Sequence, residues 1–543
     1  MHTQTTLLDG DWLLCADPDN VGIENRWFDR RPFDAHQTTV PGVIQDTICE
    51  YHGLAWYYKT FTPGRSLPDG RCLVRFHEVD FAAEIWLNGQ KVGSHEGLEE
   101  IFDFDVTDLI RVGHINLLAV RVLSPANEPI DGMVLNELAV GRRRYPVPVD
   151  HAYATGGIIG SVEFLQTPDI YIDDIHVLPN WHTGNIEVRG RLVNHCKADK
   201  PVMVRVSAAP ASGGTTLAEN AVTYNACKSD PANGSTSSTF IMPVRIEGHR
   251  WWTLNDPYMY RVTARVETEE GYFDERSVRC GFRDFRYENG YFRFNGKRIR
   301  ILGGLYTGLC FPALQSIPFD EDLLRRDVLN MKQLGFNAVR IHSGSALPRQ
   351  LDVFDEIGIL AMEESFGAGF PEGSPRIADD WERAATRVIK RDRNHPCIVL
   401  WSLLNEQQDN RLFRRAAGSL PCLRKLDPTR MILLNSGRFD KDDAIKNICN
   451  PHEEEWGIWY DQPPADDRSD DVYAKIYTAD ATGGGIDFYL FDKIGIPQSK
   501  AYEGFRESFG DVLVFGDDDR LGIPLCWNRE RCCPYTDTVR AGW

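Results

Sequence analysis

The sequence lacks the long apolar run that a membrane-spanning helix needs. No stretch approaches the roughly 20 apolar residues that cross a bilayer. The first ten residues also show no basic segment followed by an apolar one, which is the pattern of a secretory signal. We therefore expect no membrane partner and a cytoplasmic location.

Positive charge is scarce, and the cysteines form no recognisable motif. The chain has 60 lysines and arginines against 79 aspartates and glutamates, a formal net charge of −19. Such a surface repels nucleic acid and anionic lipid and favours a neutral or small partner. The 13 cysteines are scattered, and the adjacent pair Cys532-Cys533 has no metal-ligand spacing. We expect reduced, mostly buried thiols, with no metal ion and no cofactor.

The first part of the chain alternates short strands with turns. A chain of 543 residues predicts roughly three or four domains. One strand ends at Asn88-Gly89, a dipeptide that favours a tight hairpin because both residues tolerate positive φ. These features predict a jelly-roll-like β-sandwich over residues 1–168. Its expected strands are residues 71–77, 83–87, 115–122 and 161–165.

A second β-rich unit is expected over residues 169–284, and its strand lengths suit an immunoglobulin-like sandwich. Residues 208–238 are rich in Ala, Gly, Ser, Thr and Asn, so we expect them to form exposed loops. The expected strands are residues 171–177, 185–189, 202–206 and 260–266.

From residue 285 to residue 543 strands alternate with amphipathic helices after one last hairpin at residues 291–296. Such alternation predicts a parallel sheet, either doubly wound or closed into a barrel. No Gly-rich phosphate loop follows the first strand, which argues against a nucleotide-binding doubly wound sheet and against an oxidoreductase built on it. The expected strands are residues 299–302, 338–341 and 359–362, and the expected helices are residues 320–334 and one from Leu347 to Ile357 that Gly358 ends.

The segment from Arg391 to Glu406 carries the clearest chemical signal. Pro396 cannot continue a helix, and residues 397–404 form a nearly continuous apolar run, which is typical of a strand covered on both faces. Asn405 and Glu406 follow at its carboxyl end, where barrel active sites lie. Partial burial would raise the pKa of such a glutamate toward the range of a general acid. A strand followed by Asn-Glu would by itself also suit a helix-capping or ion-pairing glutamate.

The string Arg393-Asn-His-Pro-Cys-Ile-Val-Leu-Trp-Ser-Leu-Leu-Asn-Glu406 closely resembles the acid/base segment of glycoside hydrolase family 2. That family contains β-galactosidases, β-glucuronidases and β-mannosidases. Further similar strings follow in the expected order from about residue 70 to residue 440. They are Glu84-Ile-Trp-Leu-Asn-Gly89, Asn116-Leu-Leu-Ala-Val-Arg121, Gly156-Gly-Ile-Ile-Gly-Ser-Val-Glu163, Gly281-Phe-Arg283, Phe294-Asn-Gly-Lys297 and Gly335-Phe-Asn-Ala-Val-Arg340.

The resemblance implies a jelly-roll sugar-binding-type domain, an immunoglobulin-like domain and a C-terminal (β/α)8 TIM barrel. It also implies a double displacement at the anomeric carbon with retention, using two carboxylates. Glu406 matches the acid/base, and Asn405 matches the neighbour that binds the sugar 2-hydroxyl. Arg340 matches an arginine that keeps the nucleophile ionised, although a purely structural ion pair is an alternative.

Other residues at the expected barrel mouth are candidates for contact with the sugar. His342 follows the strand that carries Arg340, and a structural loop histidine is an equal alternative. Glu363 and Glu364 end the next strand, so one of them should point into the pocket; we choose Glu364 as an acceptor for substrate hydroxyls. Trp401 is expected to pack in the core rather than stack on sugar.

The second carboxylate has no clear match, because the family string Ser/Thr-Glu-Tyr/Phe-Gly is absent after Asp440. Glu503 and Glu507 are the nearest candidates, and solvent-facing helix positions are alternatives for both. We choose Glu503 because Tyr502 and Phe505 could form apolar walls beside it. In the same tail, Tyr473 and Trp527 are the residues that loosely match sugar-binding positions of the family.

The function that we predict is a retaining exo-β-glycosidase acting on terminal β-linked sugars of the β-galactoside or β-glucuronide class. The alternative is a catalytically inactive carbohydrate-binding protein with the same fold, which the missing nucleophile string favours. The partner expected in both cases is a carbohydrate and not a nucleic acid. A homo-oligomer is compatible with the resemblance, but the sequence leaves the oligomeric state open.

Overall fold

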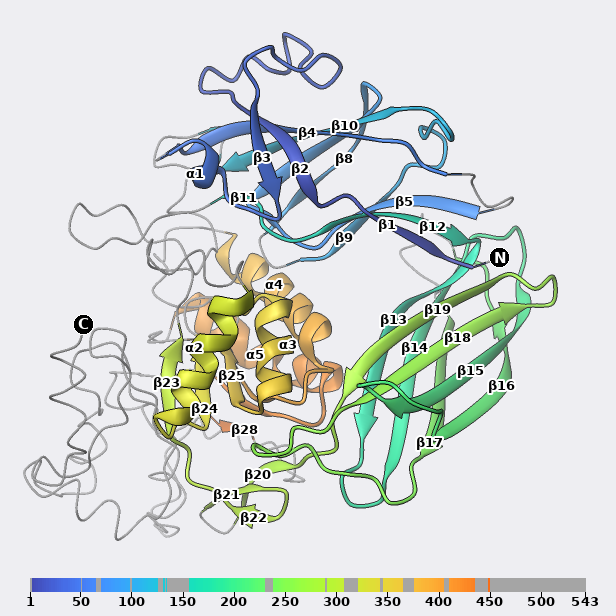
Figure 1. Ribbon diagram of the computed structural model, residues 1–543, viewed down its shortest axis with the longest axis vertical. Coiled ribbons are helices and arrows are strands. Elements are labelled where there is room, and N and C mark those ends of the chain that lie inside the picture. The colour runs from blue at the N-terminus through green and yellow to red at the C-terminus, as the bar shows by residue number, and fades with distance from the viewer. Residues whose placement is uncertain are drawn as a thin grey trace, which may run out of the picture. The chain divides into compact units, whose positions relative to one another are not determined.

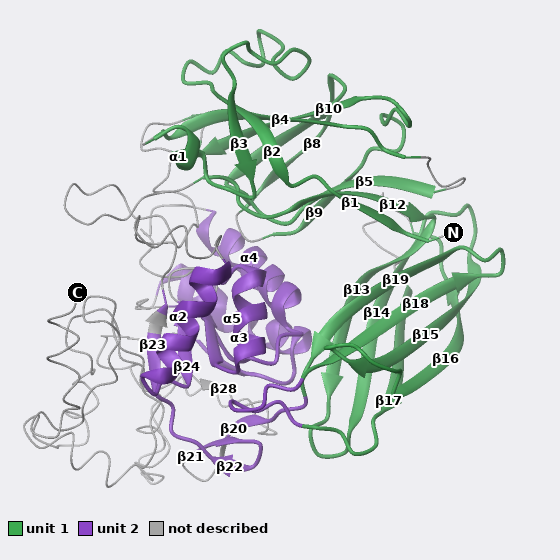
Figure 2. Cartoon of the chain, in the orientation of Figure 1, with its two compact units in different colours: residues 1–136, 153–250, 259–281 green, residues 137–152, 251–258, 282–543 purple. Residues whose placement is uncertain are grey.

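The computed structural model describes residues 2–49, 51–64, 70–97, 100–125, 130–131, 133, 156–229, 238–288, 291–306, 321–341, 345–364, 376–404, 410–434 and 448–449. The chain divides into two compact units, coloured separately in Figure 2. Unit 1 contains residues 1–136, 153–250 and 259–281, and unit 2 contains residues 137–152, 251–258 and 282–543. The finer division at residues 168 and 284 stays a prediction. No helix within the described ranges combines the length and the apolar character needed to cross a membrane.

The first part of unit 1 is a sandwich of two antiparallel sheets, drawn in blue and cyan in Figure 1. The four-stranded sheet has the order β1 (Gln4–Leu7), β12 (Val162–Pro168), β5 (Gly70–Phe76), β9 (Phe102–Asp105). The six-stranded sheet has the order β3 (His36–Val40), β2 (Gly10–Ala16), β4 (Gly53–Phe61), β10 (Asn116–Ser124), β7 (Ala82–Leu87), β8 (Gln90–Glu96). A short helix and a two-stranded ladder complete it: α1 (Ile44–Thr47), β6 (Val79–Asp80) and β11 (Gly157–Ile158).

The core of this sandwich is formed by apolar side chains from both sheets. Val74 and Phe164 from the smaller sheet are buried together with Val120 from the larger one. The expected hairpin is present: Asn88 and Gly89 have φ of 53° and 82° between β7 and β8, which is the left-handed conformation that this dipeptide tolerates. Alternating apolar residues and turn chemistry thus correctly predicted these strands.

The outer face of the six-stranded sheet holds a second, aromatic cluster. Trp56 and Trp86 lie in it with ring centroids 5.0 Å apart. The Asp17 carboxylate accepts hydrogen bonds from the backbone N–H groups of Val21 and Gly22, at 2.8 and 2.9 Å, and from Trp56 Nε1 at 3.0 Å. Because Asp17 is itself buried, these bonds fix the loop after β2 against the indole.

The second part of unit 1 is a smaller sandwich, drawn in green in Figure 1. One sheet has the order β13 (Ile170–Pro179), β14 (Asn185–Asn194), β17 (Ser238–Arg245), and the other has the order β16 (Ala218–Ala226), β15 (Lys200–Pro210), β18 (Tyr260–Thr268), β19 (Phe273–Cys280). The expectation that residues 208–238 form only loops was wrong, because β16 lies within them. Most β16 side chains are exposed and the strand pairs with β15 alone, so it has no apolar alternation to reveal it.

Strand β16 also lies beside β17 of the opposite sheet. Asn220 Nδ2 donates to the Pro243 carbonyl and the Tyr224 hydroxyl donates to the Ile241 carbonyl, both at 2.9 Å. Side chains of the edge strand β16 therefore donate hydrogen bonds to backbone carbonyls of the edge strand β17.

The longest segment of unit 2, from residue 282 onward, begins with an antiparallel meander and continues as a sheet whose strands alternate with helices. The meander has the order β20 (Phe285–Glu288), β21 (Tyr291–Phe294), β22 (Lys297–Arg298). Five parallel strands follow, β23 (Gly303–Tyr306), β24 (Ala338–Ile341), β25 (Leu360–Glu364), β26 (Ile398–Ser402) and β27 (Met431–Leu433). The connecting helices are α2 (Glu321–Gln333), α3 (Pro348–Ile357), α4 (Ile377–Asp392) and α5 (Arg411–Leu426). β28 (Ile448–Cys449) pairs antiparallel with β27.

Most of the expected elements of unit 2 are confirmed, but the first strand is displaced. Residues 299–302 were expected to form a strand, whereas β23 begins at Gly303. The prediction missed the Gly303-Gly304 pair because glycine has low strand propensity. It placed the strand too early because Ile299 and Ile301 alternate with polar residues, as in a strand. Gly358 ends α3 as expected, with a left-handed φ of 80°.

We predict that Gly22→Ala destabilises unit 1. An added Cβ would lie 2.6 Å from Asp17 Oδ2 and closer still to Trp56 Nε1, so the buried hydrogen bonds of Asp17 must shift. Overpacking of this kind costs about 1–3 kcal/mol, measurable by urea unfolding followed through tryptophan fluorescence. The matched control is Gly64→Ala, because nothing lies within 4 Å of its Cβ position. Equal stability of the two variants would contradict the prediction.

Candidate functional site

Three polar side chains meet at the carboxyl ends of neighbouring parallel strands in unit 2. Arg340 belongs to β24, Glu364 ends β25 and Ser402 ends β26. Arg340 Nη2 lies 2.8 Å from Glu364 Oε2, and the Ser402 hydroxyl donates to the same oxygen at 3.4 Å. The ion pair is buried, with 1% of the arginine side chain and 0% of the glutamate side chain exposed.

Strand alternation explains why Glu364, and not Glu363, joins Arg340. Arg340 is opposite Met362 in the ladder, and Glu364 lies two residues further on the same face. Glu363 points to the other face, where its Oε1 accepts from the Ala346 backbone N–H at 3.0 Å and lies 3.9 Å from Arg391 Nη2. The structure thus brings together the predicted residues Arg340 and Glu364.

The buried ion pair has a clear chemical capacity. Attraction between opposite charges is strong where water is excluded, so the guanidinium fixes the position of the Glu364 carboxylate. A fixed carboxylate can in turn accept hydrogen bonds from hydroxyl groups of a ligand. The sequence analysis did not name Ser402 as a site residue. Its position at the end of the buried strand could have identified it.

Trp401 packs in the core, as predicted. Its Nε1 donates to Asp427 Oδ2 at 2.8 Å, and the Arg430 guanidinium lies 5.9 Å from a ring centroid. The indole is 2% exposed, so it offers no stacking surface to a ligand.

The remaining predicted site residues lie outside the described ranges. For the acid/base candidate, the structure gives only its chain position: Glu406 follows Ser402, the last residue of β26, by four positions. The predicted residues outside the described ranges are His342, Asn405, Glu406, Tyr473, Glu503, Glu507 and Trp527.

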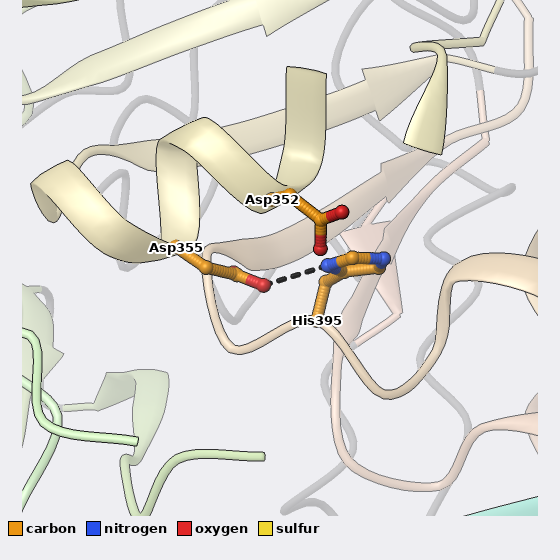
Figure 3. A group of neighbouring side chains, drawn as sticks. All are labelled: Asp352, Asp355 and His395. Carbon is orange, nitrogen blue, oxygen red and sulfur yellow. Dashed lines mark hydrogen bonds and ion pairs between the residues drawn. The ribbon is translucent and has the colours of Figure 1, made fainter. Parts of the chain in front are cut away.

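At the amino end of β26, two aspartates of α3 face a histidine (Figure 3). His395 Nδ1 lies 2.6 Å from Asp355 Oδ2, while Asp355 Oδ1 accepts from the Cys397 backbone N–H at 2.9 Å. One ligand atom each of Asp352, Asp355 and His395 lies within 4.8 Å of the others, a spacing that could suit a metal ion. Both oxygens of Asp355 are already engaged, so the contacts fit an ion pair between Asp355 and His395.

The pKa of His395 agrees with this reading. Burial on its own lowers the pKa of the imidazole, but the charge of Asp355, its hydrogen bond to the ring and the charges of Asp392 and Asp352 together raise the pKa above its usual value. The raised pKa favours the protonated ring, and with it the ion pair with Asp355. Sequence reasoning missed the pair, because its members are 40 residues apart and belong to different elements.

Eight of the thirteen cysteines lie in the part of the chain that the structure describes. None of these eight forms a disulfide; Cys15, Cys72, Cys280 and Cys397 are buried. Of the others, Cys49 and Cys422 are exposed and two are half-buried, so the expectation of mostly buried thiols holds for only half of the described set.

Comparison with family models gives three matches in chain order. The family 2 glycosyl hydrolase sugar binding domain matches residues 5–168, a second family 2 domain matches residues 170–283, and the family 2 TIM barrel domain matches residues 288–469. These matches confirm the predicted fold class of a jelly-roll sandwich, an immunoglobulin-like sandwich and a TIM barrel.

Solved structures share the fold at low sequence identity. A family 2 glycosyl hydrolase from Bacteroides cellulosilyticus is 19% identical with a TM-score of 0.64, over 80% of this chain and 57% of that one. Bacteroides uniformis β-glucuronidase 2, covalently bound to cyclophellitol-6-carboxylate aziridine, is 20% identical with a TM-score of 0.61, over 79% of this chain and 52% of that one. A Ruminococcus gnavus β-glucuronidase in complex with uronic deoxynojirimycin is 21% identical with a TM-score of 0.63, over 79% of this chain and 72% of that one.

This chain therefore spans little more than half the length of two of these three proteins. The three family domains nevertheless follow one another without a large gap from residue 5 to residue 469. On the strength of that ordered match, the chain belongs to glycoside hydrolase family 2.

Proposed function

We propose that the chain is a retaining exo-β-glycosidase that hydrolyses terminal β-linked sugars of the β-galactoside or β-glucuronide class. The observation that carries the proposal is the buried Arg340–Glu364 pair with Ser402, at the carboxyl ends of three adjacent parallel strands. Active sites of barrel enzymes occupy this end of the strands. Asn405 and Glu406 follow directly in the chain, in a string that resembles the family acid/base segment.

In the proposed mechanism, Glu406 donates a proton to the glycosidic oxygen while a second carboxylate attacks the anomeric carbon. The bond from carbon to the leaving group breaks and a glycosyl ester forms. Glu406 then takes a proton from water, the water oxygen attacks the same carbon, and the ester bond breaks to restore the carboxylate. The two carboxylates must lie about 5–5.5 Å apart. We propose Glu503 as the nucleophile.

The other residues have binding roles in this proposal. Asn405 donates to the sugar 2-hydroxyl, a bond that strengthens as positive charge develops on the ring. Arg340 keeps carboxylates at the mouth ionised, and Glu364 accepts hydrogen bonds from sugar hydroxyls. His342, Tyr473 and Trp527 complete the sugar site.

A second candidate function is carbohydrate binding without catalysis. The absence of the Ser/Thr-Glu-Tyr/Phe-Gly string after Asp440 favours it, because without a nucleophile the glycosyl ester cannot form.

Cytoplasmic location and assembly into a homo-oligomer are also proposals. Eight cysteines without disulfides support the proposed location, because reducing compartments keep thiols free.

A panel of aryl β-glycosides tests the enzymatic proposal. We expect the native chain to release phenol from a β-galactoside or a β-glucuronide. Glu406→Gln should lower kcat/KM by about 10²–10⁴-fold, the usual contribution of a general acid/base. Release is followed by absorbance, and the anomer first formed is identified by NMR.

The matched control is Glu382→Gln, because Glu382 binds Arg415 near the surface of α4 and should not affect turnover. Glu503→Gln should abolish turnover and Glu507→Gln should not; the reverse result would reassign the nucleophile. Absence of turnover by the native chain on every sugar, with sugar binding retained, would support the binding protein instead.

The buried ion pair generates a second prediction. Arg340→Met leaves the Glu364 carboxylate buried without its guanidinium, which should cost about 3–5 kcal/mol of unfolding free energy. The double variant Arg340→Met/Glu364→Leu should be more stable than Arg340→Met, because no charge then remains buried alone. Both should lose activity. Urea unfolding and kcat/KM provide the two readouts.

Arg415→Met is the control for this experiment. Arg415 is 45% exposed and pairs with Asp379 and Glu382, at 2.7 Å in each case. Exposed pairs contribute about 0–1 kcal/mol, so this variant should be nearly as stable as the native chain. If Arg415→Met lowers the unfolding free energy as much as Arg340→Met does, the buried pair stabilises the protein no more than an exposed pair.

A further inference from the structure

His395 and Asp355 form an ion pair between two segments of unit 2 (Figure 3). His395 Nδ1 lies 2.6 Å from Asp355 Oδ2, and the exposed fractions of the two side chains are 16% and 0%. Asp355 belongs to α3, whereas His395 lies just before β26. Because little water reaches the pair, its strength depends closely on the charge of each member.

The carboxylate of the pair is held in place by further bonds. Asp355 Oδ1 accepts from the Cys397 backbone N–H at 2.9 Å, and the Asp355 carbonyl accepts from Trp252 Nε1 at 2.9 Å. Turning the aspartate toward water would break these bonds. A buried carboxylate that loses its cationic partner therefore stays buried, and its uncompensated charge destabilises the contact.

The backbone before β26 has anchors that do not involve α3. Arg430 donates from Nη2 to the His395 carbonyl at 2.7 Å, and its charge is paired with Asp427, which lies 2.9 Å from Nη1. Arg283 donates from Nε to the Pro396 carbonyl at 3.0 Å. These bonds remain when the ion pair weakens. The effect of weakening the pair should therefore fall on α3 and not on this backbone.

The side-chain charges that act on the imidazole are carboxylates from two helices. Asp352 and Asp355 belong to α3 and Asp392 to α4. One ligand atom each of Asp352, Asp355 and His395 lies within 4.8 Å of the others. Arg391 donates from Nε to Asp392 at 2.9 Å and so shares the charge of that carboxylate. The surroundings of the ring thus favour a positive charge on it.

The direction of the pH effect follows from the pKa of His395. Burial lowers this pKa, but the charge and hydrogen bond of Asp355 and the charges of Asp392 and Asp352 together raise it above the usual value. In an unfolded chain the pKa of histidine is about 6.5. The ion pair therefore stabilises fully below about pH 6.5. Its effect is lost as the pH rises through the higher pKa of the folded state.

We propose that His395 and Asp355 form a pH-sensitive latch that ties α3 to the backbone before β26 and loosens when the imidazole loses its proton. A neutral ring can still donate one hydrogen bond, but it no longer compensates the buried carboxylate. The latch loosens toward alkaline pH, whereas ion-paired carboxylates lose their effect toward acid pH. It depends on contacts within unit 2 and not on the reaction that the chain catalyses.

The charge of the ring can be measured by NMR of the full chain with ¹³C-labelled histidine rings and EDTA in the buffer. The signal that is missing in His395→Asn identifies His395 among the 14 histidines. Its titration midpoint should lie above about 6.5, and Asp352→Asn should lower it. The matched control is Asp379→Asn, because Asp379 is 60% exposed and pairs with Arg415; it should leave the midpoint unchanged. A native midpoint at or below the unfolded value would overturn the latch.

Hydrogen exchange followed by mass spectrometry locates the loosening. His395→Asn keeps an amide donor near the Nδ1 position but carries no charge. At about pH 6, peptides of α3 should exchange about tenfold faster in His395→Asn than in the native chain, the ratio for a one-unit difference in pKa between closed and open states. The ratio should fall toward one by about pH 8.5. Peptides of β26 should exchange equally in both chains at each pH.

Comparison at each pH cancels the pH dependence of the exchange chemistry. If His395→Asn does not fold, Asp352→Asn carries the comparison, and its α3 ratio should show the same decline with pH. Equal acceleration in α3 and β26 would indicate general destabilisation, and an α3 ratio independent of pH would indicate a bond without a switch. Either result would overturn the latch.

Discussion

The chemistry of unit 2 depends on one constraint: charges that have left water must be paired, and the pairs must be fixed by neighbouring strands. Arg340 and Glu364 satisfy that constraint because parallel pairing of β24 with β25 places them on one face at adjoining ends. An isolated buried charge costs several kcal/mol. The pair therefore lets two charged side chains lie buried at this edge without an uncompensated charge.

The middle of β26 and its two ends make different kinds of contact. Apolar residues fill its middle, and the polar contacts gather where the strand begins and where it ends. At the beginning, side chains from α3, the segment after α5 and the entry to unit 2 bind its backbone. A strand fixed in this way holds Ser402, at its other end, beside the Arg340–Glu364 pair.

Much of this arrangement could be predicted from the sequence, and the failures have identifiable causes. The Asn88-Gly89 hairpin, α2, β24 and the buried β26 were readable because local turn chemistry and periodicity agree there. Strand β16 was missed because it is a strand by its pairing with β15 and has no apolar alternation of its own. Strand β23 was predicted too early in the chain because it begins with two glycines, which have low strand propensity. Arg340 and Glu364 could be paired from alternation, whereas Asp355 and His395 could not, since only the folded chain brings them together.

The contacts of β16 have a consequence for the pairing of this edge with other strands. An edge strand with vacant carbonyls is a template onto which a foreign strand can add. In the smaller sandwich, the Asn220 amide and the Tyr224 hydroxyl occupy the carbonyls of Pro243 and Ile241, and Pro243 offers no N–H. A strand from another molecule that adds at this border must therefore first displace both side chains.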